Sequence, residues 1–258
     1  MFIQPMFADG ALQFAFQKAT VEGKCTVGAL FLLSLFSWSI IITKFRQLYI
    51  ARKATKKFFA SYNATRDPLD MKHRGDDFDG APIYQLYIRG ADELDFQLKN
   101  NPVMVKGERR ISVASFDAVK VALEEAASGE AMILEKGMIV LSTAVAGGPF
   151  IGLLGTVWGV MSTFSGIATA GAATLTAMAP GVAGALIATV VGLLVAIPAM
   201  FAYNFMVTSI RHLTQELDSY AARYVTQIEH RYVDNRDLED KIAMALTRSE
   251  MGETTPAI

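Results

Sequence analysis

Charged residues are missing from a long stretch of this chain. Between Lys136 and Arg211 there are 74 consecutive residues without Asp, Glu, Lys, Arg or His, and Tyr203 is the only ionisable side chain among them. A bilayer core of about 30 Å is crossed by about 20 helical residues, and soluble cores do not contain uncharged runs of this length. The stretch therefore predicts two membrane crossings. We expect the turn between them at "TAGAATLT", residues 169–176.

Residues that build enzyme and metal sites are also scarce. The single cysteine, Cys25, excludes an internal disulfide, and the three histidines are scattered through polar segments: His73, His212 and His230. The motifs GxxxxGK[ST], HExxH and GxSxG do not occur, and the acidic "GDDFDG" lacks the closing Glu of a calcium loop. The net charge of −1 gives no reason to expect nucleic-acid binding. We therefore expect no enzyme activity, no metal site and no cofactor.

A third apolar segment lies near the N-terminus. "CTVGALFLLSLFSWSIIIT", residues 25–43, contains 19 uncharged residues, close to the minimum for a crossing. A secretory signal peptide is the alternative, but no small-residue cleavage site follows, and the basic residues come after the segment. By the positive-inside rule these basic residues predict a periplasmic N-terminus and, after three crossings, a cytoplasmic C-terminus. They are Lys44, Arg46, Arg52, Lys53, Lys56 and Lys57.

The three crossings divide the chain into seven predicted segments. The polar insert after the first crossing is interrupted by the turn-rich "RGDDFDGAP" and "KNNP". The stretch 108–137 that follows has helical composition and predicts one helix that continues into the second crossing. The segments are a periplasmic N-terminal segment (1–24), the first crossing (25–43), a cytoplasmic helical insert (44–136), the second crossing (137–168), a periplasmic turn (169–176), the third crossing (177–207) and a cytoplasmic C-terminal helix and tail (208–258).

An apolar stripe continues past the third crossing. Its residues recur at steps of three and four, which is typical of an amphipathic helix. We favour packing of this stripe against cytoplasmic helices of the same chain over a docking surface for another protein. The stripe contains Ile210, Leu213, Leu217, Tyr220, Tyr224 and Ile228.

Small residues recur at helical intervals in the second and third crossings. Such spacing lets helix backbones approach closely in lipid, where packing drives association. A hairpin that packs on itself uses one face of each helix, whereas these residues are spread over more than one face, which favours an oligomer. The small residues are Gly148, Gly152, Gly155 and Gly159, then Gly184, Ala188, Gly192 and Ala196, and three prolines are predicted to shape the same helices: Pro149, Pro180 and Pro198.

Two threonines are predicted to lie at the same depth. Thr156 follows Lys136 by 20 residues and Thr189 precedes Arg211 by 22, which places them roughly 30 and 33 Å from the cytoplasmic charges. Thr163 shares the helical face of Thr156. A single threonine in a membrane helix usually bonds the carbonyl four residues earlier. Two at matched depth on glycine-rich antiparallel helices predict a narrow, weakly polar surface.

These crossings resemble a known family. "GGPFIGLLGTVWGVMSTF" followed by "APGVAGALIATVVGLLVAIPAMFAYN" is similar to the second and third crossings of the MotA/TolQ/ExbB family of bacterial proton channels. "LFSWSIIITKFRQLYIARKA" similarly resembles the first crossing of the TolQ and ExbB members and its exit. Flagellar MotA proteins have four crossings, so three crossings place this chain on the ExbB/TolQ side.

The resemblance implies an all-α pentamer around a central pore in the inner membrane. In this family the pore holds a dimer of a single-span partner, ExbD or TolR, whose membrane aspartate takes up and releases protons. The positions that face this aspartate match Thr156 and Thr189. The resemblance thus implies a motor that uses the proton motive force to do mechanical work on envelope proteins, with a TonB- or TolA-like client.

One position departs from the family pattern. ExbB and TolQ usually carry a glutamate in "PGxxEAL", where this chain has Gly184 in "PGVAGAL". Proton transfer would then depend on the partner's carboxylate alone. Two alternatives to a proton-driven motor stay open, namely a non-conducting oligomeric scaffold and a sodium-driven relative, because hydroxyls and carbonyls also bind hard cations.

Overall fold

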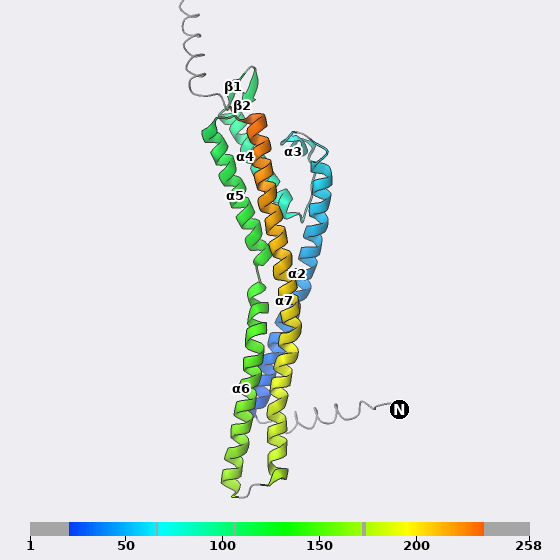
Figure 1. Cartoon of the computed structure of the whole chain (residues 1–258), viewed down its shortest axis with the longest axis vertical. Helices are drawn as coiled ribbons and strands as arrows, with labels where there is room; N and C mark the ends of the chain where they lie inside the picture. Colours follow the sequence, from blue (N-terminus) through cyan, green and yellow to red (C-terminus); the bar gives the residue numbers. More distant parts are fainter. Residues whose placement is uncertain (1–20, 66, 106, 172–173, 235–258) are drawn as a thin grey trace, which may run out of the picture. The chain divides into compact units, whose positions relative to one another are not determined.

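The computed structural model describes residues 21–65, 67–105, 107–171 and 174–234. Most of the predicted N-terminal segment, part of the predicted turn at 169–176 and the tail after residue 234 lie outside the described residues. The described elements, in chain order and with the labels of Figure 1, are α2 (Val21–Tyr62), α3 (Asp70–Arg74), α4 (Pro82–Asn100), β1 (Val103–Val105), β2 (Glu108–Arg110), α5 (Val113–Glu135), α6 (Met138–Ala170) and α7 (Leu175–Tyr232).

The chain divides into two compact units. Among the described residues, the first unit consists of 21–50 and Met132–His212, and the second of Ala51–Ala131 and 213–234. Among the residues that the structure describes, three helices are long and apolar enough to cross a membrane, at Val21–Tyr62, Met138–Thr169 and Met178–Tyr232. These helices confirm the predicted all-α class with three membrane helices.

Large apolar side chains cover the outside of the first unit. Phe36, Phe150 and Phe201 are 64%, 71% and 68% exposed. Water disfavours such surfaces, whereas the acyl chains of a bilayer accept them. The three helices therefore present a lipid-compatible surface.

The predicted continuous helix from the insert into the second crossing is wrong. α5 ends at Glu135, and α6 starts anew at Met138. Gly137 between them has φ +87°, in the left-handed region, which an α-helix cannot contain. In the sequence, the only indication of this break is Gly137 itself, a glycine within a stretch of otherwise helical composition.

The second unit has an aromatic core. Phe58 packs edge-on against Tyr220 with ring centroids 5.4 Å apart, and Tyr87 lies 5.4 Å from Tyr224. The hydroxyl of Tyr224 donates a hydrogen bond of 3.1 Å to the carbonyl of Pro68. Burial raises the pKa of the Tyr87 phenol, so this ring stays neutral.

The apolar stripe of α7 supplies much of this interior. All six of its residues are at most 4% exposed; the five from Leu213 to Ile228 belong to the second unit, and Ile210 belongs to the first. The interpretation that the stripe packs inside the same chain is thus confirmed, and it leaves little of the stripe free to bind another protein.

A β-hairpin in the insert was not predicted. β1 and β2 pair antiparallel, with Val103 opposite Arg110. Gly107, at φ +85°, allows the tight reversal between the strands. After the hairpin the main chain of Ile111 bonds the end of α7: its amide donates to Tyr232 at 2.8 Å, and its carbonyl accepts from Asp234 at 3.0 Å.

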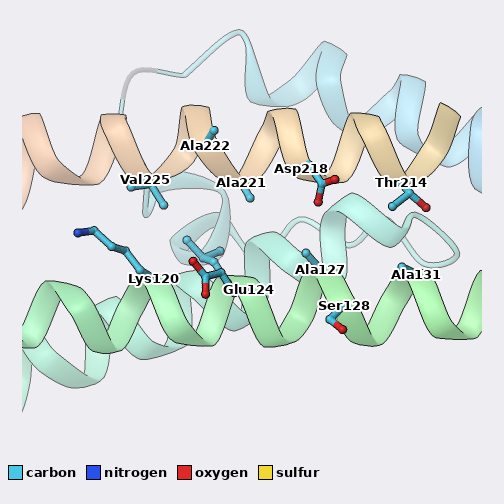
Figure 2. Close-up of a pocket in the computed structure, with 11 residues that line it drawn as sticks. Lys120, Glu124, Ala127, Ser128, Ala131, Thr214, Asp218, Ala221, Ala222 and Val225 are labelled. Atoms are coloured by element: carbon cyan, nitrogen blue, oxygen red, sulfur yellow. The ribbon is translucent and has the colours of Figure 1, made fainter. Parts of the chain in front are cut away.

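A groove lies in the second unit between α5 and α7 (Figure 2). Its floor is made of small side chains, among them Ala127 and Ala221. Figure 2 shows Thr214 and Asp218 directed from α7 toward α5. The alanines are too small to fill the space between the two helices, which leaves the groove open.

Candidate functional site

Four glycines of α6 bring this helix against α7 (Figure 1). A Cβ atom at Gly152 would stand 2.8 Å from the carbonyl oxygen of Ala188, and one at Gly159 would stand 2.7 Å from Cβ of Ala185. Side chains at these positions would force the backbones apart. The close approach depends on the absent side chains of Gly148, Gly152, Gly155 and Gly159.

Gly192 of α7 contributes to the same close contact between α6 and α7, which we call the seam. A Cβ at Gly192 would lie 2.6 Å from the carbonyl oxygen of Gly148, and Gly148 in turn faces Ala196. Gly184 is buried next to Ala185. The helices run antiparallel, because the residue numbers of the contacts increase along α6 while they decrease along α7: Gly148 meets Ala196, and Gly159 meets Ala185.

All three predicted helix-shaping prolines lie inside these helices. Pro149 belongs to α6, and Pro180 and Pro198 belong to α7. Each removes one amide donor from the helical ladder, so one carbonyl a turn earlier loses its usual partner. Both helices nevertheless continue through the prolines.

The seam brings the two predicted threonines together. The hydroxyl of Thr189 lies 3.5 Å from the hydroxyl of Thr156 and 3.3 Å from the carbonyl of Gly152. Thr156 donates its own proton to the carbonyl of Leu153 at 2.7 Å. A chain of hydrogen bonds therefore runs from Thr189 through Thr156 to the main chain of α6.

Thr189 departs from the usual habit of a membrane threonine. Its hydroxyl bonds across to the neighbouring helix rather than to a carbonyl of its own. Gly152 makes this possible, because its missing side chain brings its carbonyl close to α7. Both Thr156 and Thr189 keep part of their surface exposed.

Thr163 occupies another part of the seam. Its hydroxyl donates to the carbonyl of Gly159 at 2.8 Å, within α6. Its side chain fills the space that a side chain at Gly181 would take. Among the described residues no hydrogen bond joins it to Thr156 or Thr189, so the structure brings together two of the three predicted hydroxyls.

Sequence reasoning missed a buried polar face on α2. Thr26, Ser37 and Lys44 are 7%, 2% and 5% exposed. Thr26 lies against Gly155, where a Cβ would stand 2.7 Å from its hydroxyl oxygen. The spacings of 11 and 7 residues correspond to nearly whole helical turns, so this common face was readable in the sequence.

No metal site is apparent in the part of the chain that the structure describes. A search of these residues finds no group of three or more His, Cys, Asp or Glu side chains that could hold an ion. The chemistry available at the seam is therefore that of hydroxyls and main-chain carbonyls.

The fold and the seam define a helical membrane protein whose closely packed crossings share a pair of hydroxyls. Residues 97–219 match the model of the MotA/TolQ/ExbB proton channel family. The chain is 32% identical over 224 residues to the Tol-Pal system protein TolQ of Haemophilus influenzae, covering 84% of this chain and 92% of the relative. The chain belongs to the MotA/TolQ/ExbB proton channel family.

Other relatives carry two different names. The TolQ protein of Pseudomonas aeruginosa is 35% identical over 173 residues, 66% of this chain and 72% of its own length. The biopolymer transport protein ExbB of Salmonella typhimurium is 29% identical over 240 residues, 91% of this chain and 90% of its own. The family consists of non-enzymatic channel-type proteins, and this member is an energy-transducing, multi-pass protein of the bacterial inner membrane.

Proposed function

We propose that this protein is the pore-forming subunit of a motor that converts the proton motive force into mechanical work on envelope proteins. The observation that carries the proposal is the pairing of Thr156 and Thr189 at 3.5 Å across the seam. In this proposal the two hydroxyls line the pathway of the proton.

The hydroxyl of Thr189 donates only long, weak hydrogen bonds. Its two acceptors lie at 3.3 and 3.5 Å, whereas a strong bond between hydroxyl and oxygen is about 2.7 Å long. Rotating this proton toward a new acceptor therefore loses little energy. An ionised carboxylate that comes near Thr189 would receive a shorter, charge-assisted hydrogen bond.

The acid has to come from another chain. The second and third crossings contain no Asp, Glu, Lys, Arg or His. A carboxylate inside a membrane costs several kcal/mol unless polar groups receive it. We infer a single-span partner of the ExbD or TolR kind with a membrane aspartate, and Thr189 would make the ionised state of that aspartate accessible.

The exposed surfaces of the membrane helices also suit a homopentamer. The exposed parts of Thr156 and Thr189 would face a central pore of a homopentamer, and the exposed aromatic side chains would face lipid. The basic residues after the first crossing support a periplasmic N-terminus and a cytoplasmic C-terminus. Each proton supplies about 2.3 kcal/mol per 100 mV, so a mechanical stroke needs several protons.

The client and the ion are also part of the proposal. Relatives named for the Tol-Pal system and for biopolymer transport support a TolA-like or TonB-like client. Protons are the proposed ion, because residues 97–219 match the model of a proton channel family.

The test compares energy transduction in untreated cells, in cells treated with a protonophore and in cells in sodium-free buffer. A protonophore should abolish transduction, whereas sodium-free buffer should leave it unchanged. Loss in sodium-free buffer would identify a sodium-driven relative. Full transduction in the presence of the protonophore would contradict any proton-driven role and favour the scaffold.

A further inference from the structure

The break between α5 and α6 leaves several main-chain carbonyls at the end of α5 without helical donors. In a continuous helix the carbonyls of Ile133 and Leu134 would accept from the amides of residues 137 and 138. The last such bond of α5 runs from the amide of Lys136 to Met132, at 3.0 Å. Beyond it the left-handed Gly137 turns the chain out of the helix.

Lys44 of α2 supplies donors for two of these carbonyls. Its ammonium group donates to the carbonyl of Ile133 at 3.2 Å and to that of Leu134 at 3.0 Å. Its third bond goes to the side-chain oxygen of Gln47 at 2.8 Å. An ammonium has three protons, so every donor of this side chain is used. A cation is also favoured at the negative end of a helix dipole.

The burial of Lys44 makes these bonds obligatory. The residue is only 5% exposed, although most lysines keep their ammonium in water. A buried ammonium without partners is strongly disfavoured. The end of α5 and Lys44 therefore hold each other in place, since each satisfies polar groups that the other leaves unpaired.

The start of α6 lies beside the same residue. A Cβ at Gly137 would stand 3.5 Å from Cδ1 of Ile40 and 4.0 Å from Cε of Lys44. α2, the last turn of α5 and the first turn of α6 thus meet around one lysine side chain, all within the first unit.

We propose that Lys44 is a positioning residue that fixes the residue at which α6 begins. Each residue added to or removed from a helix turns it by 100° and shifts it by 1.5 Å. If the break moved by one residue, α6 would present a different face to α2 and α7. Lys44 prevents this by binding the two carbonyls that mark the end of α5.

Hydrogen exchange in the purified full-length protein tests the proposal. In Lys44→Met, which keeps the length of the side chain, the amides of the last turn of α5 should exchange about tenfold faster than in the wild type, because two charge-assisted bonds are lost. Lys44→Arg, which keeps the cation and its donors, should restore slow exchange. Lys53→Met is the matched control, because Lys53 is an exposed lysine of the same helix.

Three results would overturn the proposal. They are unchanged exchange in Lys44→Met, equal acceleration in Lys53→Met, and acceleration spread evenly over all of α6 rather than concentrated at the break. If Lys44→Met does not accumulate in membranes, Lys44→Gln replaces it, because the uncharged and shorter glutamine side chain also loses both charge-assisted bonds and should again speed exchange at the end of α5.

The exchange experiment is independent of the proposed function. The consequence for transport does rest on it, because Thr156 is carried by α6. We expect Lys44→Met to reduce transduction and Lys44→Arg to retain it. Faster exchange together with a silent Thr189→Val would leave Lys44 as the positioning residue and remove the proposed proton pathway.

Discussion

The hydroxyl of Thr189 lies 3.5 Å from that of Thr156, although the two residues are 33 positions apart in the chain. The approach is possible because Gly152, one turn before Thr156, has no side chain to separate the helices. The glycine spacing and the hydroxyls are therefore parts of one arrangement. Small residues bring the backbones together, and the contact places a weakly bonded hydroxyl at the surface of the pair.

Replacing Thr189 by valine tests the role of its hydroxyl. Valine has nearly the same shape, so the assembly should form, while energy transduction should fall about tenfold because a hydrogen bond to a charged group is lost. Thr189→Ser, which keeps the hydroxyl, should retain most of the activity. Transport or motility assays in cells that carry each variant give the comparison, and a fully active Thr189→Val would remove the main support for the pathway.

Substitutions of seam glycines should destabilise the protein. Gly152→Ala places a Cβ within 2.8 Å of a main-chain oxygen, so a loss of about 1–3 kcal/mol is expected from overpacking. Gly152→Leu and Gly192→Leu should disturb assembly. Gly147→Ala is the matched control, because no atom lies within 4 Å of its Cβ position. Thermal unfolding in detergent should separate the variants, and equal melting temperatures for Gly152→Ala and Gly147→Ala would contradict the packing account.

The Asp95 carboxylate should make the stability of the protein depend on pH. Hydrogen bonds from Lys72 and Lys99, both 2.8 Å long, lower the pKa of Asp95 below its usual value. A carboxyl group with a lowered folded pKa stabilises the fold above its unfolded pKa of about 3.9 and loses this contribution as the pH falls through the folded value.

Asp95→Asn removes this pH dependence. The variant should unfold at a lower temperature than the wild type at pH 7, and the difference should shrink as the pH falls below about 4. Asp117→Asn is the control, because Asp117 is 62% exposed and such surface pairs contribute little. A difference between Asp95→Asn and the wild type that stays constant with pH would refute the assignment.

The buried hydroxyl of Tyr224 should stabilise the second unit. Tyr224→Phe removes the donor to the carbonyl of Pro68 and leaves a buried acceptor unpaired, which costs about 1–3 kcal/mol. Tyr49→Phe, at a position that is 64% exposed, should have almost no effect. Unfolding followed by tyrosine fluorescence or calorimetry measures both, and indistinguishable variants would show that the bond contributes nothing.

The uncharged runs of the sequence were sufficient to predict the three membrane helices. The glycine spacings indicated close helix packing but favoured an oligomer over a hairpin packed on itself, whereas the structure places these glycines in the seam between α6 and α7 of one chain. Both patterns have a physical cause in the membrane: side chains that face lipid must be apolar, and helices that pack against each other need small residues at the contact. The similar depth of Thr156 and Thr189 followed from counting helical residues from the two flanking charges, whereas the hydrogen bond between their hydroxyls did not. The turn-rich stretch after Arg74 likewise falls between α3 and α4.

The break at Gly137 and the bonds of Lys44 could not be predicted in this way. A glycine inside a helical composition is compatible with either a continuous helix or a left-handed residue, and only tertiary contacts decide between them. Lys44 was counted among the basic residues after the first crossing, and nothing in its own segment indicates that carbonyls 89 and 90 positions away bind its ammonium. The β-hairpin depends similarly on a distant contact, because Ile111 directly after it bonds the main chain at the end of α7.

The most direct test of the proton pathway is whether Thr156 faces lipid or protein in the assembled complex. Cys25 is the one free cysteine and is exposed, so a nitroxide label is placed at position 156 in a Cys25→Ser background. A label at Phe150, which is 71% exposed, serves as the lipid-facing control. The account predicts that oxygen dissolved in the bilayer relaxes the label at 156 far less than the label at 150. Equal relaxation at both positions would contradict it.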